Sequence, residues 1–266
     1  MRKFNINEWK ILKKSKSTDF AIIAIITLVF LAVIAMNVNL LFNMTSSKTE
    51  ETGQMQLENI RSDFENKIIA SENITNQVAV ETENMLASGN TQEQFRSFFY
   101  QKAKEQNSIS KGVCFNVYIA NKKFTIIPNF DIPENYHATE RLWYKGAVET
   151  PDRIYITEPY VDASGHGMCF TMSKLLHDKE TVIALDFTFE DMQESISKMT
   201  VGSNRTALIV NKNGMIIGYT DMSLVGEKIS QKLPEYEPIL SRIVNEENHD
   251  SFLMEINGTQ HKIFTS

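Results

Sequence analysis

The 266-residue sequence lacks the motifs of most enzymes and metal-binding proteins. It has no Walker loop, no nucleophile elbow and no kinase signature. Its five histidines are scattered without the paired spacing of a zinc site, at His137, His166, His177, His249 and His261. We therefore expect no catalytic residue, no metal and no cofactor. Any enzyme that this protein controls would lie in a carboxy-terminal part beyond Ser266.

A sustained stripe of positive charge is also missing. The formal net charge is -6, from 27 Lys and Arg against 33 Asp and Glu, and no stripe of basic residues stands out. Because binding to phosphates depends on clustered Lys and Arg, nucleic acid is excluded as a partner. The 42% of hydrophobic and 23% of charged residues are typical of a folded protein.

Cysteine is scarce as well. Cys114 and Cys169 are the only two, and each lies inside an apolar run typical of strands. They could pair in an oxidising compartment, although two buried thiols fit these surroundings better.

A long hydrophobic run is present at residues 20–42, interrupted only by Thr27, Asn37 and Asn39. As a helix it would measure about 34 Å, enough to span a hydrocarbon core of about 30 Å. No clear cleavage site interrupts it, so we expect an uncleaved membrane anchor, with a buried helix of a soluble protein as the alternative. Residues 1–19 are rich in Lys and Arg. This bias predicts a protein of the cell membrane whose amino terminus is cytoplasmic and whose residues after the membrane segment are extracytoplasmic.

After the membrane segment, apolar residues recur every three or four positions, at Leu57, Ile60, Phe64, Ile68, Val78 and Met85. This spacing predicts one long amphipathic helix over residues 43–88. Its apolar seam could pack on the following domain or on a second copy in a homodimer. Gly89 ends the helix, and Thr91 with Gln94 predicts a capping box that starts another helix, to about Gln106.

Five runs rich in β-branched and aromatic residues follow: "GVCFNVYIA", "KFTIIP", "RIYITEPYVDA", "GMCFTMSKLL" and "ETVIALDFTF". They predict an α+β domain over residues 89–200, with a mostly antiparallel sheet interrupted by one irregular, aromatic-rich segment. A connecting helix starts at Asp191. Residues 201–266 then predict a smaller repeat of hairpin, helix and hairpin, which lacks a final strand and would leave a sheet edge unpaired.

This organisation resembles the double Cache sensor domains of bacterial transmembrane receptors, over about Met44 to Ser266. The segments "RLWYKGA", "ITEPYVDASGH" and "VIALDFTFEDM" look like those around the ligand pocket of the membrane-distal unit in that family. The resemblance implies a stalk helix and two PAS-like antiparallel-sheet subdomains. It also implies a receptor that binds a small extracellular molecule and signals to a chemotaxis module, a histidine kinase or a cyclic-dinucleotide enzyme.

A branch of the family that binds amino acids carries Tyr, Arg, Trp, Tyr and Asp in this order. The matching residues here are Tyr136, Arg141, Trp143, Tyr144 and Asp186, with Tyr160 as an auxiliary pocket tyrosine. The turn in "DASGHGMCF" departs from the usual pattern of the family, which leaves the selectivity for a particular side chain open.

These residue types suit an α-amino acid, which carries a carboxylate and an ammonium group on one carbon. A site that excludes water must then supply a fixed cation and a fixed anion. Arg141 can hold the carboxylate through two parallel hydrogen bonds, with donors from Tyr136 and Trp143. Asp186 would accept from the ammonium group, assisted by Tyr144 and Tyr160.

Simpler interpretations remain for each residue. The rings could be core aromatics, Arg141 a solvated surface residue, and Asp186 a helix cap or the partner of a lysine. For the whole protein, the alternatives are a sensor for an amine or an organic acid, and an anchored dimer scaffold without a small ligand.

Overall fold

The computed structural model describes residues 6–128, 130–162, 165, 167–200, 205–245 and 251–265; residues 6–25, 191, 192, 195, 199, 244 and 245 are described as backbone only. The chain divides into two compact units, Met1–Met55 and Gln56–Ser266. The division falls inside the helix that the sequence predicts over residues 43–88. The subdomain boundaries expected near residues 88 and 200 stay predictions.

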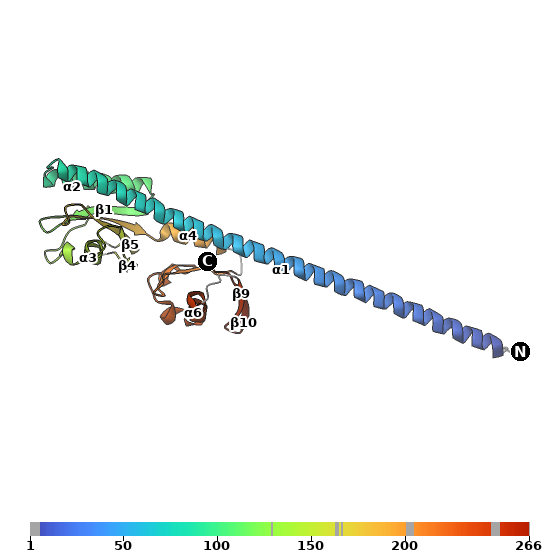
Figure 1. Cartoon of the computed structure of the whole chain (residues 1–266). Helices are drawn as coiled ribbons and strands as arrows, with labels where there is room; N and C mark the ends of the chain where they lie inside the picture. Colours follow the sequence, from blue (N-terminus) through green and yellow to red (C-terminus); the bar gives the residue numbers. More distant parts are fainter. Residues whose placement is uncertain are drawn as a thin grey trace. The chain divides into compact units, whose positions relative to one another are not determined.

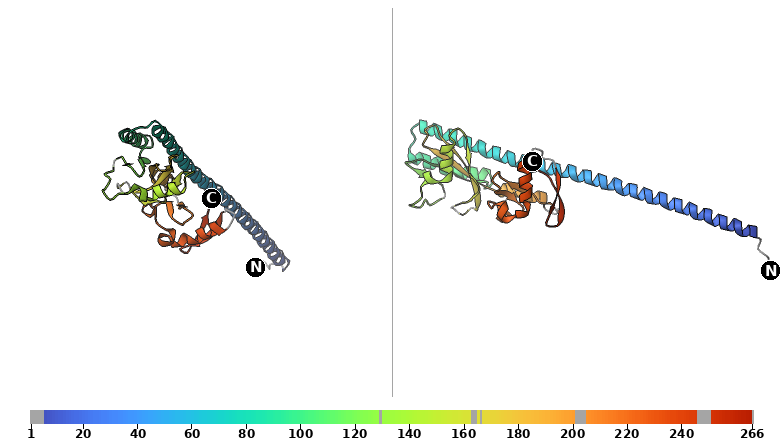
Figure 2. Two further views of the ribbon diagram at one scale, coloured as in Figure 1. Left: turned by 60° about the vertical axis from the view of Figure 1, so that its left-hand side comes forward. Right: turned by 60° about the horizontal axis from the view of Figure 1, so that its bottom comes forward.

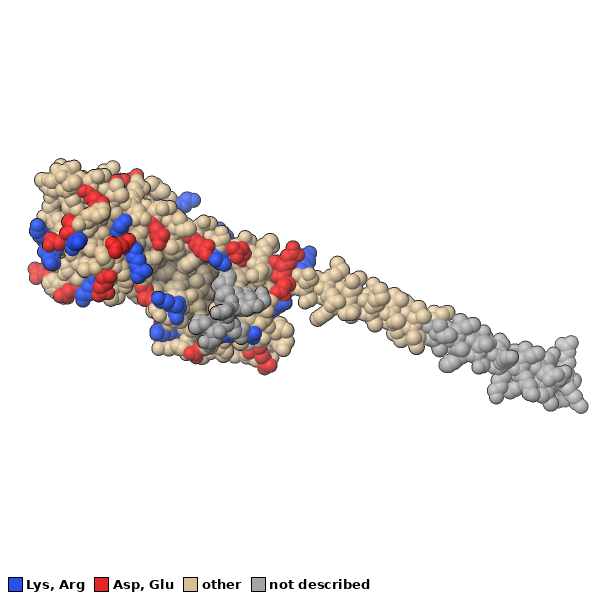
Figure 3. Space-filling model, in the orientation of Figure 1, with Lys and Arg blue, Asp and Glu red and all other residues tan. Residues whose placement is uncertain are grey.

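The first unit is formed by α1, a continuous helix from Ile6 to Ala87 that also extends into the second unit (Figure 1). From Ile26 to Met44 its large apolar side chains are exposed. In its described part, α1 contains an 18-residue window with a mean hydropathy of 2.0, none of it buried, and is long enough to cross a membrane. Figure 3 shows this stretch without charged side chains. These properties favour the membrane anchor over the buried helix of a soluble protein.

The last part of α1 belongs to the second unit and packs on the core of that unit. Val78 and Ala79 are both 1% exposed, and Phe64, Ile68 and Met85 pack against the same core. The seam that the sequence predicts therefore covers its own domain in this region. The next helix, α2 (Gln92–Ile109), begins with the expected capping box, in which Thr91 and Gln94 exchange two hydrogen bonds, and it ends three residues later than predicted.

The main sheet is antiparallel, in the order β2-β1-β6-β5-β3, with β4 also paired to β5. Its strands are β1 (Cys114–Ala120), β2 (Thr125–Ile126), β3 (Tyr155–Ile156), β4 (Tyr160–Val161), β5 (Met168–Leu175) and β6 (Val182–Thr188). The central strands are buried on both faces because helices cover each side, as the nearly continuous apolar runs in β1 and β6 indicate.

The prediction of a single strand in "RIYITEPYVDA" is wrong, because this run forms both β3 and β4. Both pair with β5, but the register changes by one residue between Ile156 opposite Met172 and Tyr160 opposite Cys169. Pro159 lies between the two strands and has no N–H to donate to a sheet. The extra residue forms a bulge here, and the sheet has six strands rather than five.

The segment expected to be irregular is partly helical. It contains the 3-10 turn η1 (Ala138–Glu140) and the helix α3 (Leu142–Glu149), with Arg141 as the residue that precedes α3. Trp143, Tyr144 and Ala147 of α3 are buried against the sheet. The sequence signal was weak because Gly146 lowers helix propensity, yet Gly146 leaves the space that the ring of Tyr155 occupies.

The connecting helix α4 (Glu190–Thr200) is confirmed, one residue earlier than predicted. Beyond it lie the hairpin β7 (Leu208–Val210) and β8 (Ile216–Tyr219), the short helical turns η2 (Met222–Leu224), α5 (Ile229–Lys232) and η3 (Pro234–Tyr236), the helix α6 (Glu237–Asn245), and the hairpin β9 (Phe252–Ile256) and β10 (Thr259–Ile263). In the described part of this region, the two hairpins form separate two-stranded sheets.

Candidate functional site

The candidate site lies on the face of the main sheet that α3 covers, whereas α1 and α2 cover the opposite face (Figure 2). Side chains alternate between the two faces of a strand, so Val117 and Ile119 of β1 pack toward α1 and α2, and Tyr118 packs toward α3. The same alternation brings Thr171 of β5 and Asp186 of β6 together as directly opposed residues.

Asp186 is the acidic centre of the site and is only 4% exposed. Its Oδ1 accepts hydrogen bonds from the hydroxyl groups of Tyr118 at 2.7 Å, Thr171 at 2.7 Å and Tyr160 at 3.3 Å. Burial raises the pKa of Asp186 to about 6, while the bonds from Thr171 and Tyr118 oppose the rise. All three of these donors are neutral hydroxyl groups. The carboxylate of Asp186 can therefore still pair with a positively charged group.

A second group of residues supplies hydrogen-bond donors. The guanidinium carbon of Arg141 lies 5.5 Å from the centre of the Tyr136 ring. The polar groups of Trp143 and Arg141 lower the pKa of Tyr136, so both lie close to its hydroxyl group. Burial raises the pKa of Tyr136, and the charge of Arg141 opposes the rise. Tyr136, Arg141 and Trp143 therefore meet as the resemblance implied.

The donor and acceptor groups are neighbours. The rings of Tyr118 and Trp143 meet edge to face with their centres 5.1 Å apart, and the charge of Asp186 contributes to the raised pKa of Tyr136. Asp186 is buried but Arg141 is exposed. The sequence led us to expect that both charges of the site are shielded from water. This is true of Asp186 but not of Arg141.

Tyr144 is positioned differently from the other predicted residues. Its hydroxyl donates a 2.6 Å hydrogen bond to the backbone oxygen of Glu180, in the turn between β5 and β6. The ring is 6% exposed and packs edge to face on Trp143. These contacts fit the simpler interpretation of a core aromatic that fixes α3 to the sheet.

Three residues of the site were missed in the sequence: Tyr118, Thr171 and Asp162. The charge of Asp162 raises the pKa values of both Asp186 and Cys169, so it acts close to the acidic centre. The signal that would have found the other two is the alternation within the strands. Polar and apolar residues alternate in "NVYI" of β1 and "FTMS" of β5, which marks one polar face inside an otherwise apolar sheet.

Two further expectations concern the surroundings of the site. Cys114 and Cys169 are both buried and free, on strands either side of β6. The turn that departs from the family pattern includes Ala163, Ser164 and His166, which lie outside the described residues.

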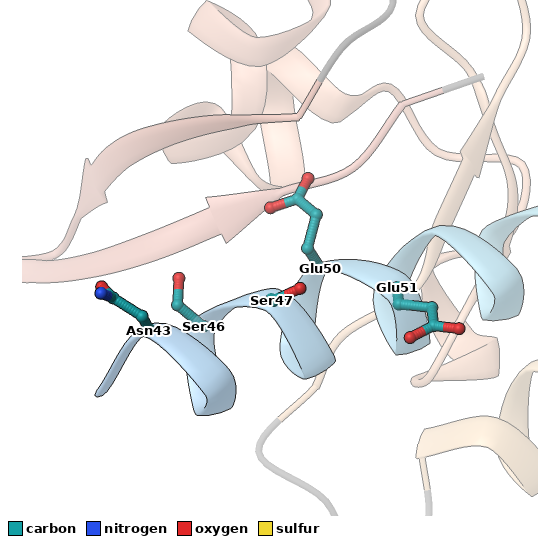
Figure 4. A pocket seen from close by; sticks show the side chains of 5 residues that line it. All are labelled: Asn43, Ser46, Ser47, Glu50 and Glu51. Carbon is teal, nitrogen blue, oxygen red and sulfur yellow. The ribbon is translucent and has the colours of Figure 1, made fainter. Parts of the chain in front are cut away.

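A surface hollow lies on α1, away from these residues in the sequence. Figure 4 shows its lining side chains, which are Asn43, Ser46, Ser47, Glu50 and Glu51. They come from successive turns of one helix and include two carboxylates but no cation or ring. This hollow lacks the opposite charges that a zwitterion needs, so the cluster around Asp186 is the candidate site.

No family model matches this sequence. Among curated proteins, it is similar to the methyl-accepting chemotaxis protein McpB of Bacillus subtilis, with 31% identity over 141 residues, which cover 52% of this chain and 20% of McpB. The chain thus spans about a fifth of the length of such relatives, since its match to McpA of the same organism covers 18% of that protein.

Solved structures with a similar fold are ligand-binding domains of chemoreceptors. The domain of the amino acid chemoreceptor PctB of Pseudomonas aeruginosa, in complex with L-Arg, matches with a TM-score of 0.61 and 16% identity, over 81% of this chain and 87% of that one. The domain of Tlp3 of Campylobacter jejuni, in complex with 4-methylisoleucine, matches with a TM-score of 0.60 and 21% identity, over 81% and 85%. Over the matched region, this chain has the double Cache fold of chemoreceptor sensor domains.

Proposed function

We propose that this chain is the sensing region of a membrane receptor, and that it binds a small zwitterion, an L-amino acid, at the candidate site. The observation that carries the proposal is the pairing of a buried acceptor, Asp186, with an adjacent set of donors headed by Arg141. The relatives named above are chemotaxis receptors, and PctB is an amino acid chemoreceptor, which supports the same conclusion.

In this proposal the ligand carboxylate binds between Arg141 and the side-chain donors of Tyr136 and Trp143. The guanidinium group of Arg141 lies over the ring of Tyr136, and the polar groups of Arg141 and Trp143 both lower the pKa of Tyr136, so these donors lie close together. Arg141 also immediately precedes α3, and the first amide groups of a helix favour an anion. The ligand ammonium group then binds at Asp186 and Tyr160.

We further propose that the amino terminus is cytoplasmic and the site extracytoplasmic, with a second copy of the chain paired through α1. Because the buried seam of α1 covers its own domain, a second copy would contact the uncovered side, where Met55, Ile69 and Val80 are exposed. Cysteine at position 69 should then give a disulfide-linked dimer on oxidation, and failure to cross-link at 55, 69 and 80 would argue against this pairing.

The decisive experiment is a calorimetric titration of the purified chain in lipid nanodiscs with the twenty standard L-amino acids, a set of amines and a set of organic acids. We expect binding of an amino acid, and its loss in both Arg141→Ala and Asp186→Ala, because each leaves one ligand charge without a partner. Arg153→Ala is the matched control, since Arg153 is also exposed and lies just after α3. Binding by Arg141→Ala as tight as that of Arg153→Ala would refute the site.

One observation favours a second candidate, a sensor for amines. Asp162 places another negative charge near Asp186. An amine ligand would need more than one carboxylate in the site, whereas an amino acid needs a single carboxylate for its ammonium group. In the same titration, binding of amines but not of amino acids, together with unchanged affinity in Arg141→Ala, would support this alternative.

A further inference from the structure

The hydroxyl groups around Asp186 form a connected set with a fixed number of protons. Thr171 Oγ1 lies 2.7 Å from Asp186 Oδ1, and the hydroxyl of Tyr160 lies 2.6 Å from Thr171 Oγ1. Tyr118 approaches the same Oδ1 at 2.7 Å from the other neighbouring strand. Each hydroxyl has one proton to donate, so the distances determine the direction of each bond.

The direction follows from the charge on the carboxylate. Tyr118 donates its proton to Oδ1, and Thr171 does the same, because bonds to an ionised acceptor are the stronger ones. If Thr171 instead gave its proton to Tyr160, its oxygen would face the carboxylate oxygen at 2.7 Å with no proton between them. Tyr160 is therefore the donor in its short hydrogen bond to Thr171. Its 3.3 Å approach to Asp186 Oδ1 is the weaker branch of the same bifurcated hydrogen bond.

Two oxygen atoms then remain as acceptors only. Tyr160 has used its proton within the sheet, and in the described part of the chain no donor reaches Asp186 Oδ2. The fully enclosed side-chain atoms without a partner, among described residues, are Thr188 Oγ1 and Gln193 Oε1. Oδ2 is not one of them, and the three hydrogen bonds described at Asp186 all end on Oδ1, which leaves Oδ2 as the acceptor for a ligand.

We propose that Tyr118 and Thr171 are positioning residues that orient the hydrogen bonds at Asp186, so that Asp186 Oδ2 and Tyr160 Oη select a protonated primary amine. This inference rests on the proposed function, which places the ammonium group at Asp186 and Tyr160, and it adds the two residues that orient this end of the site. A primary ammonium group offers three protons and a positive charge. A hydroxyl group offers one proton and no charge, and a quaternary ammonium group offers charge without protons, so both are disfavoured.

The same bonds control the ionisation of the site. Burial raises the pKa of Asp186 to about 6, and the bonds from Thr171 and Tyr118 keep it from rising further. Titratable groups that share electrostatic or hydrogen-bond contact with Asp186 are Cys114, Tyr118, Tyr136, Tyr160, Asp162 and Cys169. The tyrosines and cysteines among them all have raised pKa values and stay neutral between pH 5 and 8. Among these groups, the pKa of Asp186, about 6, lies within this window.

The test uses the chain in lipid nanodiscs and four forms: wild type, Tyr118→Phe, Thr171→Val and the conservative Thr171→Ser. The first readout needs no ligand and follows the pKa of Asp186 through the pH dependence of thermal unfolding. Tyr118→Phe and Thr171→Val should raise this pKa, by about one unit for one lost bond of this kind, and Thr171→Ser should leave it unchanged. Equal pKa values in all four forms would overturn the inference, whether or not a ligand is known.

The second readout is binding at pH 5–8 of the standard L-amino acid that binds the wild-type chain most tightly, of the 2-hydroxy acid with the same side chain, and of the N-trimethyl derivative. We expect the wild type to prefer the amino acid over both analogues by at least about ten-fold. Thr171→Val should lose about ten-fold in affinity for the amino acid, and Thr171→Ser should restore it. Equal binding of the three compounds by the wild type, or unchanged binding by Thr171→Val, would overturn this inference and leave the proposed function standing. Binding of none of the amino acids would instead refute the proposed function.

Discussion

Replacing Asp186 by Asn should remove a pH dependence of stability that arises from one buried carboxyl group. The hydrophobic sheet encloses this group, and burial raises its pKa from an ordinary 3.8 to about 6. Between these values the folded protein binds a proton that the unfolded chain has released. Stability therefore falls as the pH rises from about 4 through about 6, and the loss is complete at about pH 7.

The magnitude follows from the pKa difference of roughly two units. At about 1.4 kcal/mol for each unit, ionised Asp186 destabilises the folded state by about 3 kcal/mol relative to its protonated form. Asparagine has the same shape and no charge to lose. The stability of Asp186→Asn minus that of the wild type should therefore increase by about 3 kcal/mol between pH 4 and pH 7, and then stay constant.

Thermal unfolding followed by circular dichroism, on both forms in nanodiscs, measures this difference. For a folded region of about 200 residues, the expected change corresponds to roughly 6–12 °C in the relative midpoints. Taking the difference removes the contributions of other acidic groups, such as Asp178, whose pKa is lowered by hydrogen bonds from Thr181. Asp152→Asn, at an exposed carboxylate, is the matched control. A difference that does not vary between pH 4 and pH 7 would show that Asp186 is not desolvated, and the argument for a buried anion would be refuted.

Two further predictions concern the scaffold. Thr91→Ala removes one bond of the capping box with Gln94 and should destabilise the protein by about 1 kcal/mol, whereas Thr91→Ser should not; equal unfolding midpoints for the two variants would contradict the role of the cap. Gly226→Ala should destabilise by about 1–3 kcal/mol, because φ is +87° and an added Cβ would lie 2.1 Å from Met168 Cε. Gly89→Ala, where φ is also positive but nothing lies within 4 Å, should cost less in the same unfolding assay, and an equal cost would show that the contact with Met168 relaxes freely.

The contact at Gly226 also links the site to the carboxy-terminal region. Met168 belongs to β5, which carries Thr171, and Pro159 next to Tyr160 also lies near Gly226. Glu158 accepts hydrogen bonds from the side chains of Asn211 and Asn213, in the turn between β7 and β8. Tyr160 is thus only two residues away from Glu158, which contacts the β7–β8 hairpin.

Much of the fold follows from local patterns in the sequence. The long apolar run, the amphipathic spacing after it, the capping box and the Asn-Gly turn at Asn257 each determine an element without reference to the rest of the chain. Asn257 and Gly258 both have positive φ, as this type of turn requires. The failures arose where the local signal was ambiguous. A helix with Gly146 in its middle has a weak pattern, and the bulge at Pro159 was hidden inside one β-rich run.

By itself, the sequence determined the order of the main elements. Its resemblance to the double Cache sensors implied the site residues Tyr136, Arg141, Trp143, Tyr144, Tyr160 and Asp186. Only the tertiary structure decided which side chains surround Asp186. Tyr118 and Thr171 come from strands 68 and 15 residues away along the chain, and Asp186 meets them because β6 lies between β1 and β5. It also decided that the hydroxyl of Tyr144 bonds to the backbone of Glu180 instead of facing Asp186. Strand pairing depends on contacts between distant parts of the chain, and no local pattern of residues records them.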